Sequence, residues 1–160
     1  MEQDISKDVL TALRRIIRAI DVQSRHLTKY YGLTGPQLVV LEELQDNWSM
    51  TIGQLARNIS LSQATVTNII DRLEQKGDVK RIRSERDKRK VFVEMTPQAE
   101  QKLADKPSLL QKQFIDRFNQ LEDWEQTLIL SSLQRIVSMM NAEDIEVQPM
   151  LYSGEYNQEN

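Results

Sequence analysis

The chain contains no cysteine, a single histidine and only five glycines in 160 residues. Without cysteine it cannot form a disulfide, a cysteine-ligated zinc site or a thiol-based redox sensor. One histidine, His26, is too few for a multi-histidine metal site, and the glycines form no phosphate-binding loop. No nucleophile stands in a pattern with a catalytic base. The sequence therefore predicts neither an enzyme nor a protein that needs a metal or cofactor.

Long hydrophobic runs are absent as well. The longest uninterrupted apolar run, Leu38–Leu41, is far shorter than the roughly 20 residues that cross a bilayer. The first residues, Met1–Asp4, are acidic and lack the basic and then apolar order of a signal peptide. We therefore expect no membrane partner and a cytoplasmic location. The chain length suits a single domain.

Charge is distributed unevenly along the chain, although the net charge is only −3. Residues 76–90 hold eight basic and three acidic side chains, a local excess of five positive charges. Residues 142–160 hold five acidic side chains and no basic ones, so they mask the basic segment in the total. A concentrated basic segment favours the phosphate backbone of a nucleic acid as partner.

The first part of the chain is predicted to be helical. Apolar residues recur at steps of three and four from Ile5 to Leu27, which indicates a helix over about 5–31, roughly 40 Å long. Gly32 is expected to end that helix. A second helix is expected to start at Thr34–Pro36, because proline is favoured in a first helical turn.

Two shorter helices follow. Thr51 and Gln54 have the spacing of a capping box, which predicts the start of a third helix. Ser62 is expected to cap a fourth, and Gly77 to end it in a left-handed conformation. The apolar face of the fourth helix is predicted to be Val66, Ile69, Ile70 and Leu73.

The period then changes from helical to alternating. The apolar residues Val91, Val93 and Met95 stand at every second position, with Phe92 and Glu94 between them. This alternation predicts a half-buried strand over 91–95. Residues 80–83 are the expected antiparallel partner of that strand. The polar residues 84–89 between them are predicted to form the hairpin loop.

The end of the chain is again helical. Thr96–Pro97 predicts a helix start, Pro107 predicts a break, and a last helix is expected over about 122–141. This order predicts a mostly α-helical fold with a small β-wing: a winged helix-turn-helix with N- and C-terminal helices that form a dimerisation domain. The predicted parts are an N-terminal dimerisation helix (1–33), a winged helix-turn-helix DNA-binding domain (34–97), C-terminal dimerisation helices (98–141) and an acidic tail (142–160).

The helix that starts at Ser62 carries short polar side chains opposite its apolar face. A recognition helix offers such groups from its first turns to base edges in the major groove. The predicted base-reading residues are Ser62, Gln63, Ala64, Thr65, Thr67 and Asn68. A solvated face that contacts nothing is the alternative, but the capped helix before it and the basic hairpin after it favour DNA.

The hairpin loop is the second predicted DNA contact. Its residues are Arg86, Asp87, Lys88, Arg89 and Lys90. Arginine inserts well into a narrow minor groove, where negative potential is focused. Asp87 is expected to hold the guanidinium of Arg89, since residues two apart in an extended chain project to the same side. The alternative is a solvated cluster with a salt bridge worth about 0–1 kcal/mol.

These motifs resemble the MarR family of winged-helix regulators. The resemblance rests on residues 61–67, 71–77, 86–90 and 95–96, and the surrounding helices fit it over about 5–141. It implies a dimer whose first and last helices interlace, a recognition helix that begins at Ser62 and a wing arginine at Arg89. The family often has leucine where this chain has Met95.

A narrower resemblance is to regulators of compatible-solute (ectoine) synthesis within that family. It rests on residues 15–19, 123–126 and 148–151. It implies control of genes for compatible-solute synthesis or uptake under osmotic or ionic stress. Because DNA affinity falls with salt by a log–log slope of about −0.9 per neutralised phosphate, rising ionic strength is a candidate direct signal.

The first helix gives an independent reason to expect a homodimer. Its apolar stripe is longer than a small winged core is wide, so part of the stripe needs another surface. A two-fold dimer supplies that surface and places two recognition helices about 34–36 Å apart, one turn of DNA. The expected target is then a pseudo-palindromic operator. A monomer that folds these helices onto itself is the alternative.

The family resemblance also implies a small-molecule effector between the dimer helices and the winged core. The residues predicted to line that pocket are Arg18, His26, Tyr30, Tyr31 and Trp48. Ordinary packing or solvation of these side chains is the alternative. The sequence as a whole predicts a transcriptional regulator that binds double-stranded DNA, in the first instance a repressor. The alternative function is a winged-helix protein-interaction module without sequence-specific DNA binding.

Overall fold

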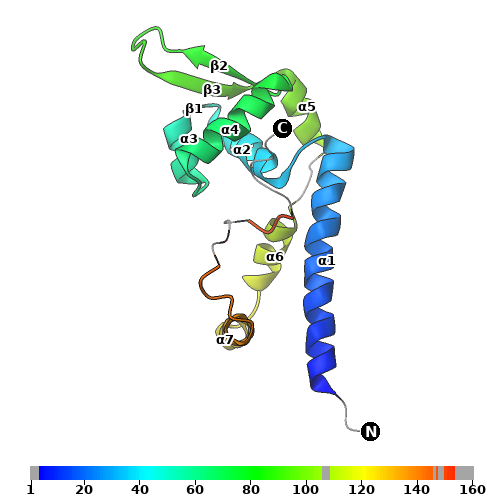
Figure 1. The fold of residues 1–160 in the computed structure, drawn as a ribbon. Coiled ribbons are helices and arrows are strands. Elements are labelled where there is room, and N and C mark those ends of the chain that lie inside the picture. Colours follow the sequence, from blue (N-terminus) through cyan, green and yellow to red (C-terminus); the bar gives the residue numbers. More distant parts are fainter. Residues whose placement is uncertain (1–3, 106–108, 146, 148–149, 154–160) are drawn as a thin grey trace. The chain divides into compact units, whose positions relative to one another are not determined.

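The computed structural model describes residues 4–105, 109–145, 147 and 150–153 (Figure 1). The chain divides into two compact units, one formed by residues up to 107 together with the segment from Tyr152 onward, the other by residues 108–151. The first unit contains α1 (Ile5–Tyr31), α2 (Gly35–Asn47), β1 (Ser49–Thr51), α3 (Ile52–Asn58), α4 (Gln63–Gln75), β2 (Val79–Arg83), β3 (Val91–Met95) and α5 (Pro97–Ala104). The second contains α6 (Leu110–Phe118) and α7 (Asp123–Met139). This mostly helical order with one small sheet confirms the predicted fold class.

α1 is one amphipathic helix of 27 residues with the predicted bounds. It ends where Gly32 takes a left-handed φ of 63° and donates its N–H to the carbonyl of Thr28 at 3.1 Å. Ser24 and Leu27 are the buried residues of the helix. Much of its apolar stripe is exposed, including Ile5, Val9, Ile16 and Ile17. The stripe is therefore available to a further surface.

Reciprocal side-chain caps fix the starts of α2 and α3. The N–H of Gln37 donates to Oγ1 of Thr34 at 3.4 Å, and the N–H of Thr34 donates to Oε1 of Gln37 at 3.1 Å. Thr51 and Gln54 make the same pair of bonds at 3.3 and 2.9 Å. Each box satisfies backbone N–H groups that a helix start leaves without partners. The second box confirms the sequence prediction.

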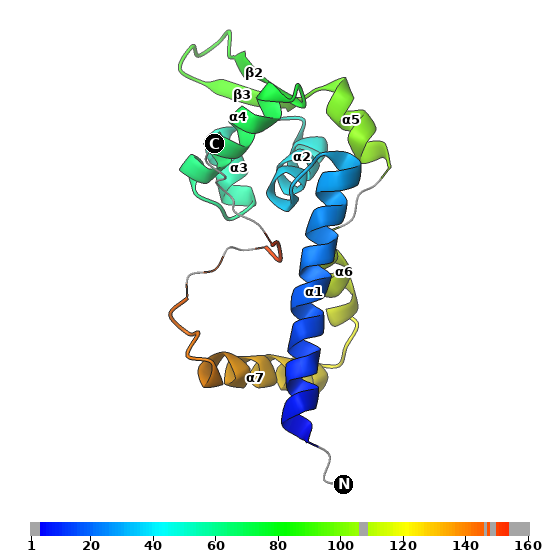
Figure 2. The ribbon, with the colours of Figure 1, turned by 45° about the vertical axis from the view of Figure 1, so that its right-hand side comes forward.

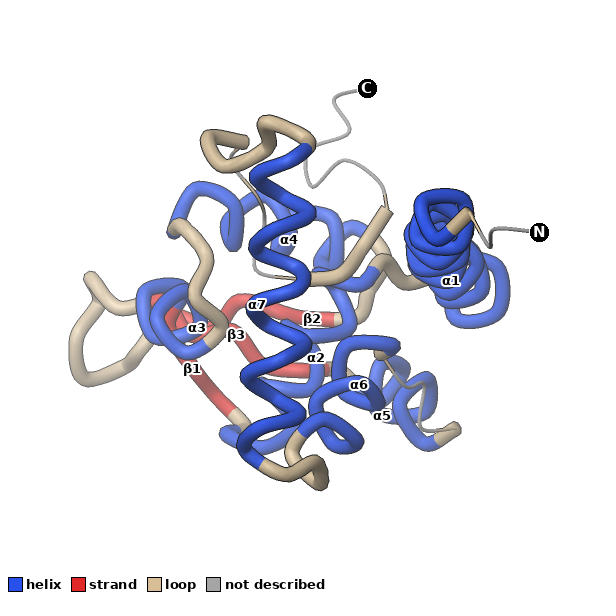
Figure 3. The backbone as a smooth tube through the Cα atoms, turned by 90° about the horizontal axis from the view of Figure 1, so that it is seen from below, coloured by secondary structure: helices blue, strands red, loops and turns tan. Residues whose placement is uncertain are grey.

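The sheet has three antiparallel strands in the order β1-β3-β2, drawn in red in Figure 3. Val93 of the central strand pairs with Met50 on one side and Arg81 on the other. The predicted hairpin of two strands is confirmed, but the third strand, β1, was missed. Three residues are too few for an alternating pattern to be visible, and their pairing partner lies more than 40 residues away.

The core of the first unit is built from one face of each surrounding element. The apolar residues with at most 1% exposed surface are Leu27, Leu33, Leu38, Val40, Leu41, Leu44, Leu55, Val66, Ile70, Leu73, Val93 and Ala99. All four residues predicted for the apolar face of α4 are buried. The tip of the hairpin of β2 and β3 extends beyond the helices of this unit in both ribbon views (Figure 2).

A buried carboxylate joins the end of α4 to α5. Asp78 is fully buried and follows Gly77, whose φ of 77° confirms the predicted left-handed cap. Nζ of Lys102 lies 2.7 and 2.9 Å from the two oxygens of Asp78, and Nε2 of Gln98 donates to Oδ1 at 2.9 Å. Burial of a charge is costly unless it is paired and hydrogen-bonded, so these contacts make the site possible.

The second unit exposes most of its apolar surface. No described residue of α6 or α7 is buried. The exposed large apolar side chains of the two helices and the residue that caps α7 are Phe114, Ile115, Trp124, Leu128, Leu130, Leu133, Val137, Met139 and Met140. The break predicted at Pro107 lies outside the described residues. Among the helices that are described, none has both the length and the apolar character needed to span a bilayer.

Substitution of Lys102 tests the buried carboxylate. Lys102→Met keeps most of the hydrocarbon stem but leaves Asp78 with a neutral donor, Gln98, as its remaining side-chain partner. We expect the free energy of unfolding to fall by about 3 kcal/mol, because a buried charge loses its counter-charge. Urea denaturation at fixed chain concentration measures the change. The matched variant Lys88→Met, at an exposed loop position, is expected to change it by less than about 0.5 kcal/mol; equal losses would contradict the assignment.

Candidate nucleic-acid interface

Ser62 begins α4 as an N-cap with extended backbone, at φ −68° and ψ 152°. Its Oγ accepts the N–H of Thr65 at 3.1 Å and lies 2.8 Å from the Thr65 hydroxyl. Just before it, Ser60 has a left-handed φ of 56°, which makes the joint between α3 and α4 tight. The remaining N–H groups of a helix start carry partial positive charge, so this end suits a phosphate.

The first turns of α4 expose the predicted base-reading face. Ser62, Gln63, Ala64 and Asn68 are exposed, and Thr65 and Thr67 are half-buried. The hydroxyl of Thr67 donates to the carbonyl of Gln63 at 2.8 Å, so the hydroxyls of both threonines already have partners near the helix start. The side chain of Gln63, by contrast, makes no hydrogen bond to any described residue. The exposed amide of Gln63 is therefore open to an external hydrogen-bond partner.

The last turn of α3 brings a further cation to this face. A Cβ added at Gly53 would lie 3.5 Å from Nε2 of Gln63 and 3.7 Å from Nη1 of Arg57. Both side chains thus approach the same glycine, and Arg57 is exposed. Arg57 is not among the DNA-contacting residues predicted from the sequence. The signal available was that it is the one basic residue in the helix before the predicted recognition helix.

The loop between β2 and β3 is closed by its own backbone. The N–H of Ser84 donates to the carbonyl of Lys90 at 3.0 Å, and the N–H of Lys90 donates to the carbonyl of Asp87 at 2.9 Å. The N–H of Asp87 donates to Oγ of Ser84 at 3.2 Å. These bonds make a compact tip. The cations exposed on it are Arg86, Lys88, Arg89 and Lys90.

Asp87 does not hold the guanidinium of Arg89, which corrects the expectation from their spacing. Its Oδ1 accepts the backbone N–H of Arg89 at 3.1 Å instead. An aspartate that bonds the N–H two residues ahead stabilises a turn, and a turn does not keep the extended geometry that the expectation assumed. The carboxylate therefore shapes the loop, and the Arg89 guanidinium forms no ion pair with any described residue.

Arg81 connects the wing to α4. Its guanidinium donates to Oδ1 of Asp71 at 2.5 Å and also to Oε2 of Glu74, two acids one turn apart on the helix. Burial lowers the pKa of Arg81, but the hydrogen bonds and charges of the two carboxylates outweigh it and raise the pKa above its ordinary value. This connection was not predicted from the sequence, although the spacing of Asp71 and Glu74 places them on one face of the helix.

The charge that remains on the wing is positive. Arg81 is neutralised by α4, and Nζ of Lys80 lies 3.4 Å from Oε2 of Glu94. Five exposed cations form no ion pair with any described residue, and we call them the wing cations: Arg83, Arg86, Lys88, Arg89 and Lys90. Lys80 and Arg81 are thus paired within the unit, whereas the wing cations remain open to an external anion.

The residues predicted to bind an effector fall into three groups. His26 lies against Tyr30 with ring centroids 4.6 Å apart, and 6.1 Å from Tyr31. Arg18 pairs with Asp21 at 3.1 Å. Trp48, which is 81% exposed, follows α2 with a φ of 60°.

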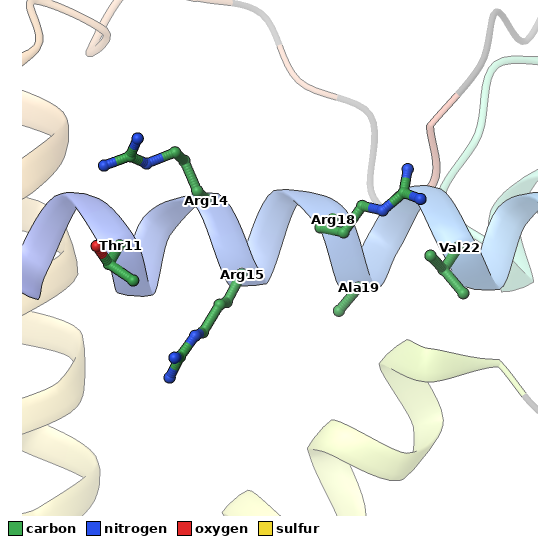
Figure 4. A pocket seen from close by; sticks show the side chains of 6 residues that line it. All are labelled: Thr11, Arg14, Arg15, Arg18, Ala19 and Val22. Atoms are coloured by element: carbon green, nitrogen blue, oxygen red, sulfur yellow. The ribbon is translucent and has the colours of Figure 1, made fainter.

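Arg18 and Trp48 each border a different depression. The depression at Arg18 is lined by Thr11, Arg14, Arg15, Arg18, Ala19 and Val22, all from α1 (Figure 4). The one at Trp48 is lined by residues of α2, the sheet and α5, including Glu94 and Glu100. Effector binding by the five residues stays a prediction. Among the described residues, no group of three or more acidic or histidine side chains is arranged to hold a metal ion.

Comparison with known proteins identifies the family. Residues 33–91, from just after α1 to the start of β3, match the MarR family. Over 129 residues the chain is 30% identical to the HTH-type transcriptional regulator YsmB of Bacillus subtilis, with 81% of this chain and 88% of YsmB covered.

Solved structures show the same fold. The transcriptional regulator BldR from Sulfolobus solfataricus is 26% identical with a TM-score of 0.54, over 87% of this chain and 99% of BldR. The overoxidized form of AbfR bound to DNA is 24% identical with a TM-score of 0.53, over 88% of this chain and 99% of AbfR, a likeness of fold alone. The chain therefore belongs to the MarR family: it is a winged helix-turn-helix transcriptional regulator that binds DNA, and not an enzyme.

Proposed function

We propose that the protein is a repressor that binds a pseudo-palindromic operator as a homodimer and thereby blocks a promoter in the cytoplasm. One observation carries the proposal: the polar start of α4 and the wing cations are both exposed, on a unit that buries the opposite face of α4. Because both belong to one compact unit, they can contact one duplex together. The likeness in fold to AbfR, whose structure contains DNA, supports this use of the fold.

Base recognition is assigned to the first two turns of α4. An exposed glutamine can bond N6 and N7 of adenine, and a small apolar side chain can contact the methyl group of thymine. Gln63 and Ala64 supply these groups side by side. Ser62, Thr65, Thr67 and Asn68 complete the proposed surface and contact bases or phosphates through their exposed atoms.

The wing is assigned to the neighbouring minor groove. Arg89 is the proposed inserting side chain, because Asp87 shapes the loop without neutralising it. Arg86, Lys88 and Lys90 then face the phosphates on either side, and Asp87 contributes through the loop conformation. Arg57, near Gln63, adds a phosphate contact from α3.

A protein-interaction module without sequence-specific DNA binding is the alternative from another class. It uses the same fold, but it does not explain why five wing cations and a capped polar helix start are exposed on the same unit. The two functions differ in whether DNA upstream of the gene competes better than random duplex for binding to the protein. Only the sequence-specific regulator predicts that it does.

Two substitutions separate base recognition from backbone attraction. Gln63→Ala is expected to cost about 1–3 kcal/mol at the preferred base and to alter base preference. Arg89→Ala is expected to weaken all sequences alike and to make the log–log salt slope about one unit shallower. Mobility-shift titrations against operator variants and random duplex measure both effects.

Arg14→Ala, an exposed arginine on α1, is the matched control and should leave both measurements unchanged. If random duplex competes as well as upstream DNA against the wild-type protein, the sequence-specific regulator is rejected in favour of the alternative.

The homodimer is proposed from apolar surface that the single chain leaves uncovered. Ile16 and Ile17 of α1 are 50% and 65% exposed, and Leu128 and Leu133 of α7 are 59% and 42% exposed. Exposed apolar surface on this scale marks an interaction site. We therefore propose that the helices of residues 1–33 and 98–141 form the dimer, and that 34–97 bind DNA.

A charge placed on the α1 stripe tests the dimer. Ile17→Glu is expected to raise the dissociation constant of the dimer by at least about a hundredfold, since a two-fold interface would bury two carboxylates without partners. Sedimentation velocity measures the change, with Arg15→Glu as the control off the stripe. A wild-type protein that sediments as a monomer, or an unchanged Ile17→Glu dimer, contradicts the proposal.

The narrower assignment to compatible-solute genes rests on the sequence resemblance alone. The part of this assignment that can be argued physically is a direct effect of ions on DNA affinity. The clustering of cations on the wing favours such an effect. We expect operator affinity to fall with a log–log slope of about −0.9 per phosphate contacted when potassium glutamate is raised. The same osmolality supplied by sucrose should have little effect. A flat response to the salt rejects ionic sensing and leaves a small-molecule effector, bound near the predicted residues, as the remaining signal.

A further inference from the structure

The C-terminal segment of the chain returns to the first unit. The N–H of Ser153 donates to Oγ of Ser24 on α1 at 3.0 Å, and the hydroxyl of Ser153 donates to Oδ1 of Asp21 at 3.2 Å. These bonds join residues more than 125 positions apart in the sequence. Tyr152 and Ser153 therefore belong to the same compact unit as α1 and α2.

Gly35 forms a notch for the ring of Tyr152. A Cβ added at Gly35 would lie 3.1 Å from Cδ2 of the tyrosine and 3.5 and 3.6 Å from its Cγ and Cβ. The first distance is closer than ordinary van der Waals contact, so even alanine would have to displace the ring. Gly35 does not have a positive φ, and glycine is disfavoured in helices. The absence of a Cβ at the start of α2 thus lets the ring approach this closely.

Polar groups beside the notch are already arranged for the segment. Ser24 is only 5% exposed, and its hydroxyl donates to the carbonyl of Ile20 at 2.8 Å while accepting the N–H of Ser153. Asp21 uses its other oxygen, Oδ2, for Arg18 and Arg25 at 3.1 and 2.9 Å. The segment therefore satisfies a nearly buried hydroxyl and the remaining oxygen of a paired carboxylate.

We propose that the Gly35 notch is a docking site for the C-terminal segment of the same chain, with Tyr152 as the anchor. The chain passes between its two units twice, once between α5 and α6 and once just before Tyr152. Docking gives the second passage a fixed attachment on the DNA-binding unit. Docking thereby reduces the number of orientations that the DNA-binding unit can adopt before it binds. A dimer whose two DNA-binding units are restricted in this way loses less conformational entropy when both bind their half-sites. This last consequence rests on the proposed function.

Disulfide trapping tests the docking directly, because the chain has no cysteine of its own. The full-length double variant Ser24→Cys/Ser153→Cys is expected to form an intrachain disulfide rapidly under mild oxidation. Ser6→Cys/Ser153→Cys is the control: Ser6 lies 18 residues from Ser24 on the same helix, about 27 Å along its axis. Equal trapping in both pairs, or a disulfide between two chains, overturns the proposal.

The notch itself is tested by Gly35→Ala within the trapping pair. Alanine improves helix propensity, so the fold should be retained as judged by thermal unfolding. The added methyl group, however, should lower the trapping rate, and Tyr152→Ala should lower it by about tenfold. Unchanged rates in both variants would show that the ring and the notch do not hold the segment.

A binding measurement connects docking to DNA. Tyr152→Ala in the otherwise native chain is expected to weaken binding to a duplex with two half-sites by several-fold, and to leave binding to a single half-site unchanged. Equal affinities on the two-site duplex would overturn the coupling. If the wild-type protein binds no specific duplex, the proposed function fails, while the trapping result still decides the docking.

Discussion

The burial of one face of α4 is the constraint on which the interface depends. Val66, Ile69, Ile70 and Leu73 fix the rotation of the helix, and burial of each such side chain is worth about 1.5–3 kcal/mol. A helix held by these positions must expose the residues between them. Ser62 then fixes where the helix begins, so the same side chains that build the core determine which polar groups face outward.

Ion pairs extend this rigidity from the helix to the wing. Arg81 fastens β2 to the acids of α4, and the buried Asp78 fastens the turn after α4 to Lys102 of α5. The recognition helix, the hairpin and α5 are therefore connected by charged contacts as well as by the apolar core. Such connections matter for a DNA reader, because the helix and the wing must meet neighbouring grooves with fixed spacing.

Local signals in the sequence were sufficient for much of this account. The bounds of α1, the Thr51 capping box, the Ser62 cap and the left-handed Gly77 each depend on neighbouring residues, so the sequence predicted them. The short strand β1, the partners of Asp78 and the docking of Tyr152 on Gly35 depend on contacts across tens of residues. Asp87 is a third case. Its spacing to Arg89 predicted a contact with the guanidinium, but the loop forms a turn, and the backbone N–H of Arg89 donates to the carboxylate instead.

In each protomer of the proposed dimer, burial of the apolar face of α4 leaves the polar start of that helix and the wing exposed, and both are proposed to contact one side of a duplex. Hydroxyl-radical footprinting of the wild-type protein on DNA upstream of its own gene tests this most directly. We expect two protected patches on one face of the duplex, with centres about 10–10.5 base pairs apart or a multiple of that spacing. Continuous protection without such a period, or patches on opposite faces, would contradict it.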